Sequence, residues 1–153
     1  MPEPIKKRIG EILVEDGVLS KENLEEALVH QKKEGGVIGQ ILIRLGYVSE
    51  ENLIAALSKQ LSIPYLPIMN YSVDTEVSRK MDHDFCKMAM MIAFDEDDRY
   101  VYLATSDPLN TTAIQNAEKV FSKRPQIFIS TPSEIQNLLD LAFAGKSQGP
   151  NQK

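Results

Sequence analysis

The chain has 153 residues, of which 42% are hydrophobic and 25% charged, a balance typical of a globular protein with one domain or two small subdomains. Its net charge of -5 argues against a protein that binds nucleic acid polymers through a basic face. With a single cysteine, no secretory signal and no apolar run long enough to span a membrane, we expect a cytoplasmic protein without direct membrane insertion.

The first part of the chain contains two copies of one motif. A shift of 29 positions aligns residues 8–31 with residues 37–60, and 12 of the 24 aligned pairs are identical. Chance would give about one or two identities at this composition, so the repeat is genuine. The identical pairs are Ile9/Ile38, Gly10/Gly39, Ile12/Ile41, Leu13/Leu42, Gly17/Gly46, Ser20/Ser49, Glu22/Glu51, Asn23/Asn52, Leu24/Leu53, Ala27/Ala56, Leu28/Leu57 and Gln31/Gln60.

Each copy is expected to form a helix, a tight turn and a second helix. Gly17 and Gly46 are placed as left-handed residues that follow the first helix, and Ser20 and Ser49 as N-caps of the second. The helix after each cap has an apolar stripe that ends in a glutamine. We therefore expect four short helices in residues 1–60, which form a duplicated helical subdomain.

The pattern changes after the second copy. Residues 61–68 contain Pro64 and Pro67 and are expected to form an extended linker, because proline disfavours helix at the preceding residue. We expect a small α/β subdomain at residues 69–145 and a disordered tail at residues 146–153.

Strand-like and helix-like segments alternate in the small subdomain. In chain order the expected elements are a short helix around 74–80, a β-hairpin from 87–94 and 99–106, a helix at 111–121, a strand at 125–130, and a helix from a capping box at Thr131 to about Ala144, ended by Gly145. The expected fold class is α+β: a repeated helix-turn-helix pair, then a small three-stranded α/β sandwich with its helices on one face of the sheet.

No group of residues predicts catalysis. The sequence GKS at 145–147 lacks the glycine that a phosphate-binding loop has five residues earlier, and it follows a helix rather than a strand. The sequence MDHDFC at 81–86 brings two aspartates, a histidine and a cysteine together, but it matches no common zinc spacing, and surface carboxylates are the simpler interpretation. We expect no enzyme, no metal site and no cofactor.

The glycines and glutamines of the repeat suggest a ligand. Gly10 and Gly39 lie inside opening helices, where glycine costs roughly 1 kcal/mol relative to alanine. Close helix packing and close approach of a ligand to the backbone are both open explanations. Gln31 and Gln60 are either solvated helix ends or groups that read the edge of a base. A doubled site of this kind would suit a two-fold symmetric ligand.

The full motif points to a known family. The first copy matches the pattern R-L-G-x-x-[aliphatic]2-x-x-G-[aliphatic]2-x4-L-x3-L-x2-Q through Arg8, Ile9, Gly10, Leu13, Val14, Gly17, Val18, Leu19, Leu24, Leu28 and Gln31. The second copy follows after a spacer at residues 32–36. This doubled pattern resembles the MshEN domain, the N-terminal domain of type II secretion and type IV pilus assembly ATPases. LSIPYLPI, VYLATSDPLN and TPSEIQNLLDLAF resemble the α/β part that follows the motifs in those proteins.

The resemblance implies binding of cyclic di-GMP, the bacterial second messenger, with one guanine half held by each motif copy. The family's contacting positions fall on Arg8, Ile9, Gly10, Leu24, Leu28 and Gln31 in the first copy, and on Val37, Ile38, Gly39, Leu53, Leu57 and Gln60 in the second. The alternative is a docking module that needs no nucleotide and joins a protein partner in a secretion, pilus or motility system.

Two positions of the second copy depart from the family pattern. Val37 stands where the pattern has arginine, and Tyr47 stands where it has an aliphatic residue. The sequence also has no Walker motif, so we expect either a stand-alone domain or a part of a longer ATPase.

Overall fold

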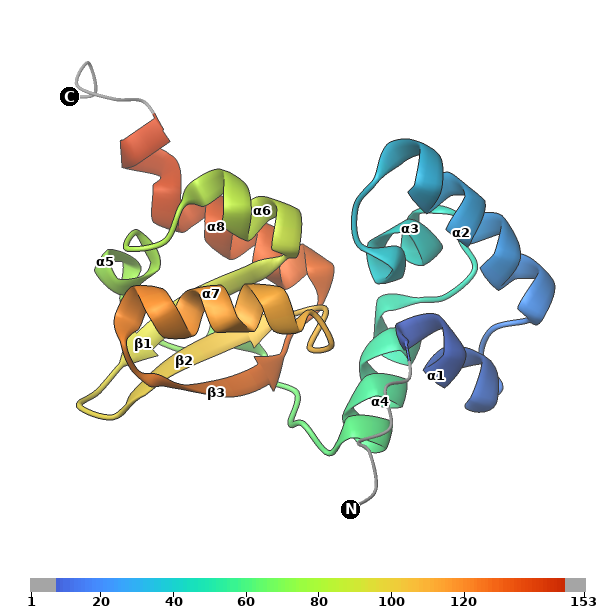
Figure 1. The fold of residues 1–153 in the computed structure, drawn as a ribbon, viewed down its shortest axis with the longest axis horizontal. Coiled ribbons are helices and arrows are strands. Elements are labelled where there is room, and N and C mark those ends of the chain that lie inside the picture. Colours follow the sequence, from blue (N-terminus) through green and yellow to red (C-terminus); the bar gives the residue numbers. More distant parts are fainter. Residues whose placement is uncertain (1–7, 148–153) are drawn as a thin grey trace. The chain divides into compact units, whose positions relative to one another are not determined.

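The computed structural model describes residues 8–147 and confirms that the chain is an α+β protein, with helices and one three-stranded sheet. The chain divides into two compact units, Met1–Ser62 and Ile63–Lys153. We call them the helical unit and the α/β unit (Figure 1). Within residues 8–147, no helix is both long and apolar enough to cross a membrane.

The helical unit contains two helix-turn-helix pairs. Its helices are α1 (Ile9–Glu15), α2 (Lys21–Glu34), α3 (Ile38–Arg44) and α4 (Glu50–Leu61). Ser20 and Ser49 begin α2 and α4, and each hydroxyl accepts the backbone N–H three residues later, at 3.1 and 3.0 Å.

The turns inside the two pairs have the same geometry. Gly17 and Gly46 have φ angles of 81° and 82°, a left-handed conformation that favours glycine. The residues that follow them, Val18 and Tyr47, donate their N–H groups to Leu13 and Leu42 at 3.1 and 2.9 Å. This bonding closes the last turn of α1 and α3 and turns the chain into the next helix.

The four helices pack into one core in which the two copies interlock. α1 contacts α2, α3 and α4, and α2 contacts α3. The fully buried side chains of this core include Ile12, Leu13, Leu42, Leu53 and Leu57, each with at most 1% of its surface exposed. Each such side chain contributes about 1.5–3 kcal/mol through its burial.

The α/β unit is built on the hairpin and the third strand that the sequence predicts. β1 (Met91–Glu96) and β2 (Tyr100–Thr105) are antiparallel, and β3 (Arg124–Ile129) is parallel to β2, which gives the order β1-β2-β3. The connection between β2 and β3 contains α7 (Thr111–Phe121), whose bounds are those predicted. The remaining elements are a short 3-10 helix η1 (Ile68–Asn70) and the helices α5 (Thr75–Ser78), α6 (His83–Ala89) and α8 (Pro132–Ser147).

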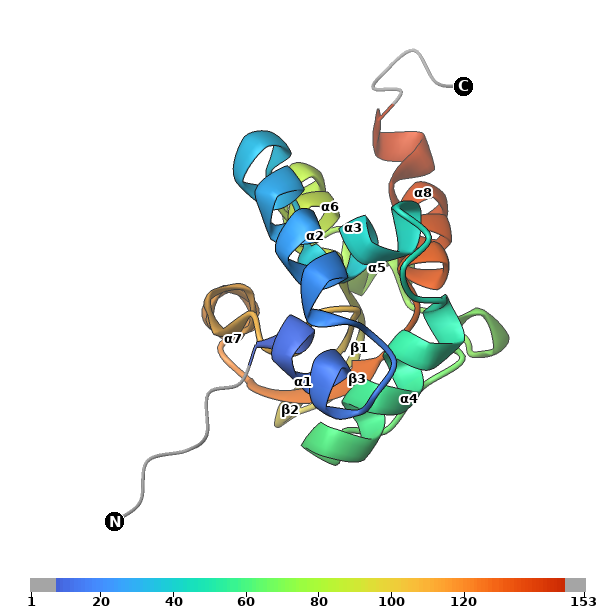
Figure 2. The ribbon, with the colours of Figure 1, turned by 90° about the vertical axis from the view of Figure 1, so that its right-hand side faces the viewer.

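We expected the helices on one face of the sheet, and this expectation is wrong. α7 contacts β2 and β3, whereas α8 contacts β1 and β2, and Figure 2 shows the sheet between these two helices. The four residues 91–94 of β1 are all buried, as in a strand that is covered on both faces. The parallel connection through α7 carries the chain over one face, which leaves the other face to α8.

Two predicted element ends are also wrong. Residues 87–89, predicted as the start of a strand, form the end of α6, and Met90 turns the chain with a left-handed φ of 54° before β1 begins. α8 continues through Gly145 to Ser147, so residues 146–147 of the predicted tail are helical. The rest of that tail lies outside the described residues.

The predicted linker at 61–68 is extended over most of its length but is largely part of the α/β unit. Leu66 donates its N–H to the carbonyl of Ile129 at 2.8 Å, and Ile129 donates its own N–H to the carbonyl of Pro64 at 2.9 Å. The side chains of Leu66 and Ile68 are buried. The segment thus pairs with the end of β3.

Candidate functional site

The first position of each motif copy is the N-cap of the helix that opens it. Arg8 precedes α1 and Val37 precedes α3, with φ angles of -84° and -89°. The Arg8 N–H donates to Glu11 Oε1 at 3.0 Å, which fixes the start of α1. The Arg8 side chain is exposed and forms no ion pair within residues 8–147, whereas Val37 is only 8% exposed. The first copy therefore offers a guanidinium where the second offers an apolar contact.

The motif glycines lie against a leucine of the following helix. A Cβ on Gly10 would lie 2.4 Å from Leu24 Cδ1, and a Cβ on Gly39 would lie 3.2 Å from Leu53 Cδ2. The first distance is too short for any side chain at position 10 unless Leu24 moves. Close helix packing, one of the two explanations that the sequence leaves open, therefore accounts for Gly10, whereas a Cβ at position 39 would need only a small shift of Leu53.

The leucine stripes of the two copies differ in exposure. In the first copy Leu24 is half-buried and Leu28 is 38% exposed, so the stripe on α2 is open to solvent. In the second copy Leu53 and Leu57 have no exposed surface. The two stripes have the same leucines, but the stripe of the first copy is an accessible apolar surface and the stripe of the second copy belongs to the core.

The two glutamines also differ in their surroundings. Gln31 is half-buried, and its Nε2 donates to the carbonyl of Gly36 at 2.9 Å, which brings the end of the first stripe beside the start of the second copy. Gln60 is exposed. Its neighbour Lys59 forms an ion pair with Asp16 at 3.1 Å, at the C-terminal end of α1. Gln60 therefore lies toward the end of α1 opposite to Arg8.

At the second position of each copy the difference in exposure is the opposite: the residue of the first copy is buried and that of the second copy is accessible. Ile9 is 2% exposed and belongs to the core, whereas Ile38 is half-buried. Taken together, the predicted site residues that solvent reaches are Arg8, Leu24, Leu28, Gln31, Ile38 and Gln60.

The polar residues that distinguish the second copy are bonded to α2. Arg44 forms an ion pair with Glu34 at 2.7 Å, and the Tyr47 hydroxyl donates to Glu26 Oε1 at 2.5 Å. The hydrogen bond from His30 and the charge of Arg44 lower the pKa of Glu34. The bond to Glu26 raises the pKa of Tyr47. Arg44 is therefore engaged in an ion pair that links α3 to α2.

A family model described as the MshEN domain matches residues 61–149, more than half of the chain. The chain belongs to the MshEN domain family. The match covers the α/β unit and leaves out the two motif copies, so the residues that identify this MshEN domain and the predicted ligand residues lie in different parts of the sequence.

Three relatives extend the similarity over both units. The type IV pilus assembly ATPase PilB of Myxococcus xanthus (strain DK1622) is 23% identical over 144 residues, which are 94% of this chain and 25% of that protein. A structure of MshE with cdg (cyclic di-GMP) has 27% identity and a TM-score of 0.66, and it covers 89% of this chain and 99% of its own. The N-terminal domain of XpsE, at 24% identity and a TM-score of 0.73, covers 92% and 97% and is similar in fold.

The residues around His83 have structural contacts in this MshEN domain. Asp82 caps α6 by accepting the N–H of Phe85 at 2.9 Å, and the His83 ring stacks on Phe143 with centroids 4.3 Å apart. Burial, together with the charge of Asp82, raises the pKa of the Cys86 thiol to about 12. In the described part of the chain, no three His, Cys, Asp or Glu residues are grouped to hold a metal ion.

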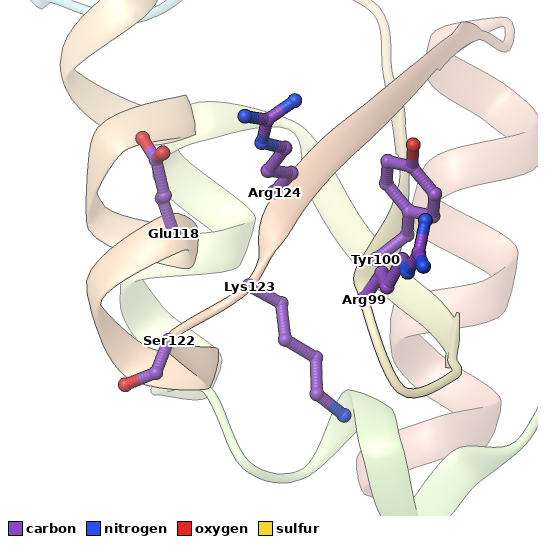
Figure 3. Close-up of a pocket in the computed structure, with 6 residues that line it drawn as sticks. All are labelled: Arg99, Tyr100, Glu118, Ser122, Lys123 and Arg124. Carbon is purple, nitrogen blue, oxygen red and sulfur yellow. The ribbon is translucent and has the colours of Figure 1, made fainter.

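Sequence reasoning missed a pocket in the α/β unit, at the end of the sheet where β2 and β3 begin (Figure 3). We call it the basic pocket. Its lining residues are Arg99, Tyr100, Glu118, Ser122, Lys123 and Arg124. They come from two segments of the sequence, residues 99–100 and 118–124, and the parallel pairing of Tyr100 with Arg124 brings these segments together. The adjacent basic residues Lys123 and Arg124 are the local hint of this pocket in the sequence, and no sequence pattern connects them with Arg99.

Proposed function

We propose that the chain is a receptor domain that binds cyclic di-GMP through its helical unit and passes the signal to a protein partner. The observation that carries the proposal is the doubled motif, whose first copy presents an exposed arginine, an open leucine stripe and a glutamine. The similarity to MshE, which has been solved with cyclic di-GMP, gives independent support.

The first copy has the chemistry that a guanine nucleotide requires. The Arg8 guanidinium can stack on a base or bond to a phosphate, and Leu24 and Leu28 offer an accessible apolar face to a flat ring. The Gln31 amide donates one N–H to Gly36, and its second N–H and its carbonyl oxygen suit the edge of a base. We propose that Ile9 and Gly10 support this half of the site from beneath, because both are buried.

The second copy is proposed to hold the other half of the ligand more weakly. Ile38 and Gln60 are its accessible members, while Val37, Gly39, Leu53 and Leu57 support them from the core. A stacking or charge-assisted arginine contact is worth about 1–3 kcal/mol. Its absence at position 37 lowers the affinity about tenfold to a hundredfold.

Calorimetric titration of the whole chain with cyclic di-GMP tests the proposal. We expect saturable binding with a micromolar or tighter dissociation constant, and a loss of about tenfold or more in Arg8→Ala, which removes the guanidinium of the predicted site. Lys87→Ala is the matched control, since it removes an exposed positive charge from α6 in the α/β unit. Equal effects of the two substitutions would exclude a specific role of Arg8.

A docking module that needs no nucleotide is the second candidate. It is favoured by Val37 in place of arginine and by the complete burial of Leu53 and Leu57, which makes half of the repeat part of the core. No detectable heat of binding at hundreds of micromolar cyclic di-GMP would reject the receptor function and leave the docking module as the proposed function. In either case we propose that the protein partner belongs to a secretion, pilus or motility system, since PilB is a pilus assembly ATPase.

A further inference from the structure

The basic pocket of the α/β unit has no role in the proposed function, since all predicted ligand residues belong to the helical unit. We propose that the basic pocket binds an acidic segment of a protein partner, an extended peptide with several Asp or Glu carboxylates.

Two guanidinium groups in the pocket are unpaired. Within residues 8–147, neither Arg99 nor Arg124 forms an ion pair or a side-chain hydrogen bond, and both side chains are exposed. Figure 3 shows the Arg124 side chain between Glu118 of α7 and Tyr100 of β2. A guanidinium presents a planar set of donors that fits a carboxylate with two parallel hydrogen bonds. Two such groups at one end of the sheet therefore suit two separate carboxylates.

The third cation of the pocket, Lys123, is held by an ion pair. Lys123 donates to Glu96 Oε1 at 2.7 Å, and Glu96 also pairs with Lys80. In Figure 3 the Lys123 side chain points away from Arg124 and Tyr100. The unpaired positive charges that an incoming ligand meets within residues 8–147 are those of Arg99 and Arg124, and the carboxylates of Glu118 and Asp97 lie beside them.

The backbone that carries these arginines is held in place. Asp97 Oδ1 accepts the N–H groups of Arg99 and Tyr100 at 2.9 and 2.8 Å, and Asp97 Oδ2 accepts the Tyr102 hydroxyl at 2.6 Å. On the other side, the Arg124 N–H donates to the carbonyl of Arg99 at 3.1 Å. A partner therefore meets a fixed backbone, so the ordering cost of association falls mainly on the arginine side chains.

The shape of the pocket favours a peptide over a small phosphorylated compound. Its volume is about 660 Å³, but Arg99, Glu118, Ser122 and Arg124 are all exposed, so a small ligand would remain largely in water. An extended segment can place spaced carboxylates on the two arginines and turn its backbone N–H groups toward Glu118.

Fluorescence anisotropy with a fluorescein-labelled hexaglutamate peptide tests the proposal on the whole chain. We expect saturable binding that is about tenfold weaker in the double variant Arg99→Gln/Arg124→Gln, a size typical of two exposed ion pairs. Binding should also disappear at about 1 M salt, where the screening length falls to roughly 3 Å. The double variant should still bind cyclic di-GMP like the wild type, so the result is independent of the proposed receptor function.

The matched control is Lys21→Gln/Lys87→Gln, which changes the net charge by the same amount at two exposed positions outside the pocket. Equal weakening by both double variants, or no binding to the wild type, would overturn the proposal. Competition by inorganic triphosphate at lower concentration than hexaglutamate would instead assign the pocket to phosphate ligands. Self-association that the Arg99→Gln/Arg124→Gln variant abolishes would assign it to a second copy of this chain.

Discussion

Position 28 and its repeat partner, position 57, have the same residue and opposite environments. Leu28 is 38% exposed on α2, whereas Leu57 of α4 has no exposed surface. The sequence predicts each as part of the apolar stripe of its own copy, because the pattern shows only that a helix face is apolar. Whether that face meets another helix or remains free depends on how the two copies interlock, and here α4 packs on α1. The repeat therefore identifies equivalent positions but not equivalent roles.

Substitution of these two leucines separates stability from ligand binding. Leu57→Ala should lower the free energy of unfolding of the helical unit by about 2–5 kcal/mol, the usual cost of a buried Leu→Ala change. Leu28→Ala should cost less than about 1 kcal/mol and still weaken cyclic di-GMP binding, because its side chain is accessible. Urea denaturation followed through the amide NMR signals of α1–α4 provides the stabilities. Similar losses in both variants would contradict the assigned environments.

At the scale of elements, short sequence motifs correctly predicted helix starts that depend on hydrogen bonds between residues close in sequence. The capping box at the start of α8 is present, with Glu134 N–H bonded to Thr131 Oγ1 at 3.1 Å and Thr131 N–H to Glu134 Oε1 at 2.9 Å. The break between α6 and β1 was missed, because it occurs within one apolar run. The left-handed residue there is Met90, and a non-glycine residue in that conformation leaves no signal in the sequence. The placement of helices on both faces of the sheet depends on contacts between residues far apart in sequence, which the spacing of apolar residues does not predict.

The end of β1 joins three segments of the α/β unit through Glu96. It accepts from Lys123, which precedes β3, and from Lys80, which follows α5. These hydrogen bonds, first that of Lys123, lower the pKa of Glu96 below its ordinary value of 4.5. A carboxyl group whose pKa is lower in the folded state stabilises the fold above its ordinary pKa, and this stabilisation is lost as the pH falls through the folded pKa.

Glu96→Gln should therefore lower the melting temperature at pH 6, and the gap to the wild type should close as the pH falls below about 4.5 toward pH 3. Circular dichroism melts across this pH range measure the gap. Glu25→Gln, at an exposed position on α2, is the control and should leave the melting temperature close to that of the wild type at every pH. A gap for Glu96→Gln that is constant with pH would rule out the ion pairs as its cause.

Over the whole molecule, the residues that match the family model and the proposed ligand residues lie in different units. The family model matches the α/β unit, while the doubled motif that suggests a ligand lies in the helical unit. The sequence located the motif because its copies are separated by a fixed 29 positions. It did not locate the basic pocket, since Arg99 and Arg124 become neighbours only through the parallel pairing of β2 with β3. Sites made of one repeated segment are visible in a sequence, and sites assembled by a sheet crossover are not.

The affinity ratio between Val37→Arg and wild type for cyclic di-GMP, measured by calorimetry, tests the central claim most directly. If the two copies form one nucleotide site that lacks a single arginine, Val37→Arg should bind about tenfold or more tightly than the wild type. Val37→Ala, which removes apolar contact without adding a guanidinium, should not gain affinity. Equal affinities of Val37→Arg and the wild type, or no binding by either, would contradict the account.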